Sequence, residues 1–246
     1  MPAYHFSPFA IPAAVTAAVV IGFAITIVVT RFSRTSVAVF VLCVAAAAWQ
    51  VACVFMDLAV DSRVAMIWAR VGCACVPLIA AAAYQFVAAI LESANHRRII
   101  CVVAWLLAAR LVVVTVTTTY LVGGVRRFWW GFYPTYNLGG RVLYPLFCSS
   151  LFVAAMVDIA RAYPSSKGRE RSRIRLFTIA MGIGCAGAID FLPAYGLAIS
   201  SVDSANARAS ARSGVMSLKT MPGRGKSGMS RMKEFRSRSA GSIHPN

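Results

Sequence analysis

Residues 9–30 read FAIPAAVTAAVVIGFAITIVVT, a run without a charged side chain. A helix rises about 1.5 Å per residue, so a run of this length spans the roughly 30 Å hydrocarbon core of a bilayer. Similar runs recur along the 246-residue chain, which is 59% hydrophobic and 13% charged. A soluble domain carries about 25% charged residues. The sequence therefore predicts an all-α, polytopic transmembrane helix bundle and excludes an ordinary soluble enzyme.

Six such runs define the spans that the sequence predicts within residues 1–200. They cover about 9–30, 36–56, 64–91, 99–122, 142–160 and 176–199. No basic region precedes the first run, which is too long for the apolar core of a signal peptide, so we expect it to remain as a span. A longer loop between the fourth and fifth spans is rich in aromatic residues, which favour the headgroup level of a membrane.

Lys and Arg residues alternate in number from one side of the predicted bundle to the other. The turns at 31–35, 92–98 and 161–175 hold ten of them, whereas the N-terminus and the loops at 57–63 and 123–141 hold four. Cytoplasmic loops carry the excess of basic residues in membrane proteins. This bias predicts that the N-terminus of the multi-pass protein lies outside. The apolar spans themselves imply membrane lipid as a partner. The bias also accounts for much of the net charge of +17 without nucleic acid.

Residues 201–246 differ sharply from the rest of the chain. Ser, Arg, Ala and Gly make up 26 of these 46 residues, and no apolar run occurs among them. Such a composition cannot bury enough apolar surface to order itself, so we expect a disordered basic tail. The change near Ser200 is abrupt. Six spans that start from outside would also place this basic tail outside, against the positive-inside bias, so two interpretations stay open. The tail is a genuine product, or it is out-of-frame or truncated sequence in place of a seventh span.

Ionisable residues inside predicted spans are costly and are therefore candidates for function. Arg70 and Asp190 each fall roughly 9 Å from the outer boundary, and we expect them to pair across the bundle. The pair either locks two helices together or reads a polar ligand, with Trp68 and Tyr195 as aromatic walls or as packing residues. Asp158 lies near the opposite edge, where its spacing predicts a local pair with Arg161.

Several short motifs and single residues between and within the spans follow a recognisable order. They are Trp68-Ala69-Arg70, Pro77, Phe86, Asn137-Leu138-Gly139-Gly140, Tyr144, the basic loop 161–175 and Leu192-Pro193-Ala194-Tyr195-Gly196. In this order and spacing, residues 9–199 resemble the seven-span N-terminal sensor region of bacterial sensor histidine kinases. The resemblance implies a sensory or input module of two-component type in a bacterial inner membrane.

The chain departs from that family in the parts that perform catalysis. Its three histidines are His5, His96 and His244, none on a cytoplasmic phospho-acceptor helix, and no glycine-rich ATP-binding region follows. We therefore expect a sensory module without its own kinase core, not an enzyme and without a cofactor. It would act through a separate cytoplasmic signalling partner or as a homodimer. The cysteines lack metal-ligand spacing, so no metal site is predicted. The alternatives are a small multi-pass transporter or permease-like protein and a structural membrane protein.

Overall fold

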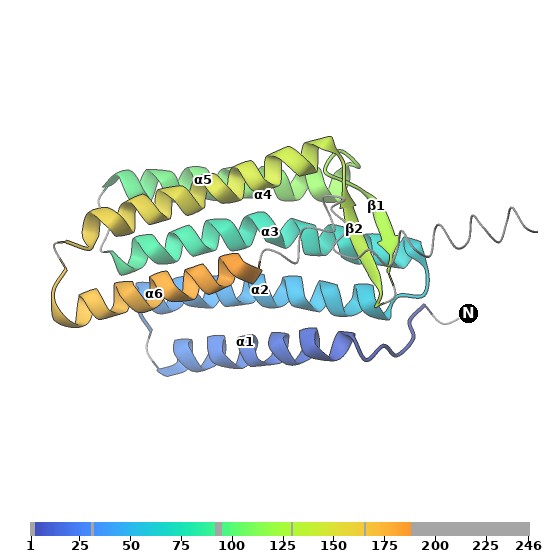
Figure 1. The fold of residues 1–246 in the computed structure, drawn as a ribbon, viewed down its shortest axis with the longest axis horizontal. Helices are drawn as coiled ribbons and strands as arrows, with labels where there is room; N and C mark the ends of the chain where they lie inside the picture. The colour runs from blue at the N-terminus through green and yellow to red at the C-terminus, as the bar shows by residue number, and fades with distance from the viewer. Residues whose placement is uncertain (1–2, 31, 92–94, 129, 165, 188–246) are drawn as a thin grey trace, which may run out of the picture. The chain divides into compact units, whose positions relative to one another are not determined.

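The computed structural model describes residues 3–30, 32–91, 95–128, 130–164 and 166–187. Helices dominate these residues (Figure 1). They are α1 (Ala10–Thr30), α2 (Arg34–Leu58), α3 (Ser62–Ile90), α4 (Asn95–Thr117), α5 (Leu138–Ala162) and α6 (Gly168–Gly187). Between α4 and α5 lie two antiparallel strands, β1 (Val122–Arg127) and β2 (Phe132–Tyr136).

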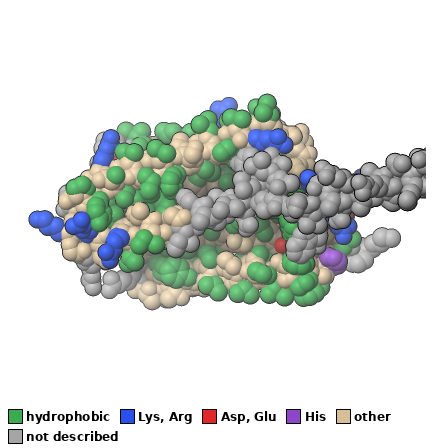
Figure 2. Space-filling model, viewed as in Figure 1, with side chains coloured by type: hydrophobic (Ala, Val, Ile, Leu, Met, Phe, Trp, Pro, Cys, Tyr) green, Lys and Arg blue, Asp and Glu red, His purple; other side chains and the backbone are tan. Residues whose placement is uncertain are grey.

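Five of the described helices are long and apolar enough to cross a membrane. They are α1, α2, α3, residues 97–117 of α4, and α5. Large apolar side chains on α1 and α4 are exposed, as lipid-facing residues are, and hydrophobic side chains cover much of the surface in Figure 2. This confirms the predicted polytopic bundle for its first five spans. Of the sixth predicted span, only 176–187 belongs to the described part of the chain, and the predicted tail lies outside it.

The prediction of an all-α chain is wrong between α4 and α5. The fourth span was expected to reach residue 122, but α4 ends at Thr117 and residues 122–127 form β1. The Asn137 side chain donates a 2.7 Å hydrogen bond to the Thr119 carbonyl, which ends the helical pattern there. Gly123 and Gly124 follow, and glycine is a poor helix former. The aromatic loop expected here is therefore a hairpin.

Helix α3 is the central element of the bundle. It contacts α2, α4 and α5 and both strands. Its buried positions are mostly small residues, such as Ala65, Ala69, Gly72 and Ala81, which let neighbouring backbones approach closely. A Cβ on Gly72 would stand 3.3 Å from the Cβ of Ala52 in α2. The predicted span at 64–91 thus becomes the helix against which the others pack.

Helices α1 and α2 contact each other, and each buries alanines placed seven residues apart; the α2 set includes Ala52, which faces Gly72 of α3. The buried residues of α1 are Ala10, Ala17 and Ala24, and those of α2 include Ala38, Ala45 and Ala52. Seven residues are close to two helical turns, so each set forms one narrow stripe. Small-residue stripes support close helix contact in a membrane, where the hydrophobic effect gives helices no reason to associate.

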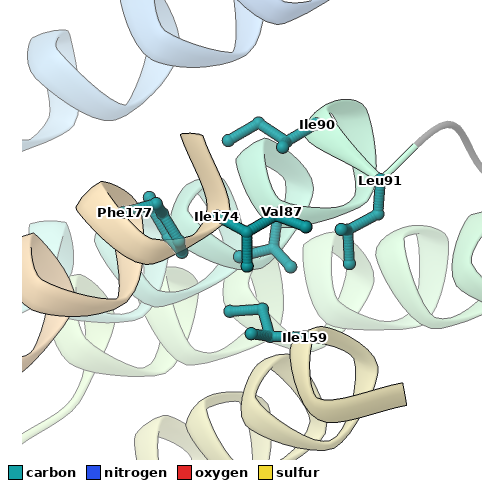
Figure 3. Close-up of a pocket in the computed structure, with 6 residues that line it drawn as sticks. All are labelled: Val87, Ile90, Leu91, Ile159, Ile174 and Phe177. Atoms are coloured by element: carbon teal, nitrogen blue, oxygen red, sulfur yellow. The ribbon is translucent and has the colours of Figure 1, made fainter. Parts of the chain in front are cut away.

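Helix α6 packs against α3 and α5 at the end of the bundle opposite the hairpin. Six apolar side chains from these helices meet there (Figure 3): Val87, Ile90, Leu91, Ile159, Ile174 and Phe177. They leave no room between them for a water molecule. Phe177 also meets the ring of Phe86 edge to face at 5.2 Å. We call this end, where Arg97 of α4, Arg161 of α5 and Arg171 of α6 lie, the basic end; Figure 2 shows Lys and Arg side chains here and also near the hairpin.

The segment Asn137-Leu138-Gly139-Gly140 opens α5 against the end of α4. Asn137 bonds to Thr119 through its side chain, and its backbone N–H donates to the Leu121 carbonyl at 3.1 Å. A Cβ on Gly140 would collide with that same carbonyl, and one on Gly139 would enter the ring of Tyr120. Both glycines are therefore required for close approach rather than for an unusual backbone conformation.

We expect Gly140→Ala to destabilise the bundle because the Leu121 backbone cannot move aside cheaply. Overpacking costs about 1–3 kcal/mol, which lowers the unfolding midpoint by several degrees. The matched control is Gly22→Ala in α1, where a Cβ meets nothing within 4 Å. Alanine favours a helix over glycine, so this variant should be as stable as the parent or more so. Thermal unfolding of the purified protein in detergent checks both, and equal midpoints would contradict the prediction.

Candidate functional site

The N-terminal segment crosses the hairpin end of the bundle and is held there by backbone hydrogen bonds. The His5 N–H donates to the Leu58 carbonyl at 2.9 Å, and the Val60 N–H donates to the Ala3 carbonyl at 3.1 Å. These bonds make a short antiparallel bridge between Tyr4 and Ala59. Residues 5–9 therefore lie beside the C-terminal end of α2, next to the hairpin.

The hairpin supplies the opposite wall. Phe132 is buried against Ala59 and against Ala65 of α3, which fixes β2 on the bundle. The turn closes when the Phe128 N–H donates to the Gly131 carbonyl at 2.7 Å. The rings of Phe128 and Trp130 stack in this turn with centroids 4.7 Å apart and planes 12° apart. The turn thus holds two stacked aromatic rings next to β2.

A cavity of about 200 Å³ lies between these two walls. Its lining combines aromatic rings with three ionisable side chains. The lining residues are His5, Phe6, Ser7, Pro8, Phe9, Asp57, Ala59, Arg127, Phe128, Trp130, Gly131 and Phe132. An engineered apolar cavity of about 150 Å³ binds benzene, so this volume suits a small molecule. Apolar walls with a few placed polar groups are typical of ligand sites.

Asp57 and Gly131 both line the cavity and lie in close contact. A Cβ on residue 131 would stand 2.5 Å from Asp57 Oδ1 and 3.0 Å from its Cα. Glycine is therefore the residue that lets the hairpin turn close over the carboxylate. The Asp57 side chain is half-buried as a result.

The two charged side chains of the cavity lining, Asp57 and Arg127, do not form an ion pair with each other. Arg127 is exposed, and its guanidinium carbon lies 5.6 Å above the Phe132 ring. Among the described residues, no Lys, Arg or His nitrogen lies within 4.0 Å of the Asp57 carboxylate. The cavity lining thus holds an acidic and a basic side chain that are not paired with each other.

The sequence singled out Trp68 and Arg70 as ligand-binding residues, and the structure places them on different faces of α3. Trp68 stacks on Phe55 with centroids 4.3 Å apart and donates a 3.0 Å hydrogen bond to the Tyr4 hydroxyl. Arg70 instead faces α4, where Nη1 donates to the Val116 carbonyl at 3.3 Å. Neither lines the cavity. Through its hydrogen bond to the Tyr4 hydroxyl, Trp68 contacts the residue that precedes His5 of the lining.

The other two predicted site residues, Asp190 and Tyr195, lie outside the described residues. The expected ion pair between Arg70 and Asp190 therefore stays a prediction. The observed partner of Arg70 is a carbonyl in the last turn of α4, where the helix dipole favours a cation.

A buried network of charged and polar groups joins three helices near the basic end. The Tyr84 hydroxyl of α3 donates to Asp158 Oδ2 of α5 at 2.9 Å, and Arg97 Nε of α4 lies 3.5 Å from the same oxygen. Arg97 Nη1 also donates to the Leu91 carbonyl at 2.8 Å. Asp158 and Tyr84 are both buried, so this carboxylate depends on its partners for solvation.

A second polar contact lies beside this network. Trp105 of α4 donates a 2.8 Å hydrogen bond to the side-chain oxygen of Gln85 of α3. The Asp158 network and the Trp105–Gln85 hydrogen bond both join α4 to α3. Lipid tails cannot hydrogen-bond to these polar groups, so the groups bind each other.

These contacts correct the sequence-based interpretation of Asp158. Spacing predicted a local pair with Arg161 on the same helix, but Arg161 is exposed and Asp158 turns inward to Tyr84 and Arg97. Spacing describes neighbours on one helix, whereas tertiary packing decided which face of α5 is buried. Arg110, which falls inside the fourth predicted span, lies on an exposed face of α4.

Sequence reasoning missed Asp57, His5 and Arg127 as a group. Asp57 was assigned to the end of a span and Arg127 to a loop, and no pattern linked either residue to the N-terminal segment. The one available signal was the density of aromatic residues at 128–136, which was assigned to the membrane interface. Among the described residues, no group of three His, Cys, Asp or Glu side chains is placed to hold a metal ion.

We expect Asp158→Asn to destabilise the bundle by about 3 kcal/mol, because it leaves the Arg97 charge without its carboxylate. Arg161→Gln, three residues further along the same helix, should change stability by less than about 0.5 kcal/mol. Replacing the network as a whole, by Tyr84→Phe, Arg97→Met and Asp158→Leu together, should restore most of the loss. Unfolding in SDS titrations measures all three. A stable Asp158→Asn variant would contradict the buried pair.

Gly131→Ala should disturb the cavity, because the added methyl group displaces the Asp57 side chain. We expect a midpoint lowered by several degrees, the effect of about 1–3 kcal/mol of overpacking. Gly124→Ala is the matched control in the same hairpin, since its Cβ meets only Thr135 Oγ1 at an ordinary 3.5 Å. Thermal unfolding distinguishes the two, and equal midpoints would show that the turn does not close tightly on Asp57.

Comparison of the chain with protein-family models and with curated proteins found no match to either.

Proposed function

We propose that this chain is a membrane-embedded sensory or input module of two-component type, without a kinase core of its own. The observation that carries the proposal is the cavity at the hairpin end, lined by aromatic rings and by a carboxylate that has no counter-cation among the described residues. A site of this kind suits recognition of a small solute. The buried network around Asp158, at the opposite end, supports a way to transmit its occupancy.

Helix α3 connects the two sites. At the hairpin end Ala65 packs against Ala59 and Phe132, which belong to the cavity lining. At the basic end Tyr84 bonds to Asp158. Ala65 and Tyr84 are 19 positions apart in α3, which is roughly 28 Å along a helix. A shift of α3 caused by a ligand at one end therefore moves the Tyr84 hydroxyl at the other.

The Asp158 network is suited to detect such a shift. Asp158 Oδ2 is shared by Tyr84 of α3 and Arg97 of α4, so a small displacement of α3 changes how the carboxylate is solvated. Buried networks of this kind respond strongly when one hydrogen bond is lost. Helix α6 packs on α3 and α5 close by and continues the chain from this end. In our proposal the basic end faces the cytoplasm of a bacterium, where a separate signalling partner or a second copy responds.

A small transporter is the competing function. A transporter needs a route through the bundle, with its site near the bilayer midplane. The cavity described here lies at one end of the bundle instead, and this position favours a sensory role over transport.

Hydrogen exchange on the full chain in nanodiscs tests the proposal. A panel of amino acids, amines, carboxylates and sugars is screened for protection of the hairpin, residues 122–136. We expect a solute that protects the hairpin to change exchange near residues 91–101 and 158–164 as well. Asp57→Asn should abolish both effects, whereas Asp61→Asn, an exposed carboxylate outside the cavity, should leave them intact.

Two results would contradict the sensory proposal. Protection confined to the hairpin would show that the cavity is not coupled to the basic end. Uptake of the same solute into proteoliposomes, lost in Asp57→Asn, would assign the cavity to transport instead.

A further inference from the structure

We infer that the cavity at the hairpin end takes a small organic cation of the quaternary ammonium class. This inference deepens the proposed function and uses the same site. It rests on three features of the lining: an unneutralised carboxylate, a wall of aromatic rings and a volume that fits a small molecule.

The carboxylate of Asp57 is the electrostatic centre of the cavity. It is half-buried under the hairpin turn, with Gly131 against it. A carboxylate removed from water without a partner is costly, and a cation in the cavity removes that cost. Arg127 does not serve this purpose, because its guanidinium sits over the Phe132 ring and no ion pair joins it to Asp57 among the described residues.

The walls match the class of ligand that the carboxylate favours. Phe6, Phe9, Phe128 and Trp130 line the cavity together with Phe132. Cations bind over aromatic faces, and such cages recognise quaternary ammonium groups, which cannot donate hydrogen bonds to a polar site. Phe128 and Trp130 stack with centroids 4.7 Å apart, and the guanidinium carbon of Arg126 lies 5.4 Å from the Phe128 centroid, so a ring of this lining already takes part in a cation–π contact.

The volume limits the ligand to a small molecule. At about 200 Å³ the cavity exceeds the one that holds benzene and is smaller than the sites that hold drug-sized ligands. Choline is a suitable probe. The neutral 3,3-dimethylbutan-1-ol has the same shape without the charge, and 3,3-dimethylbutanoate is a comparable anion.

The experiment measures binding of the three probes to the full chain by equilibrium dialysis. The nanodiscs are made of phosphatidylglycerol, so that no lipid headgroup supplies a competing ammonium. We expect choline to bind at least tenfold more tightly than the neutral alcohol, and the anion to bind more weakly still. Asp57→Asn should weaken choline binding about tenfold or more, and Asp61→Asn should not change it. Trp130→Leu keeps the charge and removes a ring, and should weaken binding about tenfold.

The outcomes separate this inference from the proposed function. Equal binding of choline and the alcohol, or choline binding unchanged in both Asp57→Asn and Trp130→Leu, overturns the cationic class. Binding of the anion alone, lost in Arg127→Gln, also overturns it but leaves a ligand site and the sensory proposal standing. The sensory proposal fails separately, through the exchange and uptake results described above.

Discussion

The packing of α3 against three helices and the hairpin is the constraint on which the rest of this structure depends. In a bilayer the backbone of every span must satisfy its own hydrogen bonds, and helices gain little from the hydrophobic effect when they associate. Close contact through small residues is what remains. Gly72 and the alanines of α3 provide it, and Pro77 is buried inside the helix without ending it. The cavity at one end and the Asp158 network at the other are both positioned by this helix.

The two ends of the bundle hold charge in different ways. At the basic end Asp158 is buried and satisfied by Tyr84 and Arg97, so its charge stabilises one arrangement of α3, α4 and α5. At the hairpin end Asp57 is half-buried and lacks a described counter-cation within ion-pair distance. A satisfied buried charge resists change, whereas an unsatisfied one at a cavity wall favours a ligand of opposite sign. In the function proposed above, this contrast distinguishes a receiving end from a responding end.

Sequence reasoning located most of the helices because hydrophobic run length is a strong local signal. The runs at 9–30 and 36–56 became α1 and α2 with small changes at their ends. The same reasoning extended the fourth span to residue 122, because Leu121 and Val122 are apolar. It had no means to know that Asn137, many residues later, bonds to the Thr119 carbonyl and that Val122 pairs with Tyr136. Arg70 was selected by its depth and Trp68 as an aromatic wall beside it, but the cavity is formed by other residues.

By itself the sequence determined a membrane bundle and the approximate limits of its first five spans, because both follow from the length and polarity of continuous segments. Only the tertiary structure decided that Asp158 turns to Tyr84 and Arg97 instead of Arg161, and that His5, Asp57 and Arg127 share one cavity. These groupings join residues far apart in the chain, and local periodicity does not encode which helix faces or loop ends meet. Packing against α3 brings the helices and the hairpin together, and these groupings follow from that arrangement.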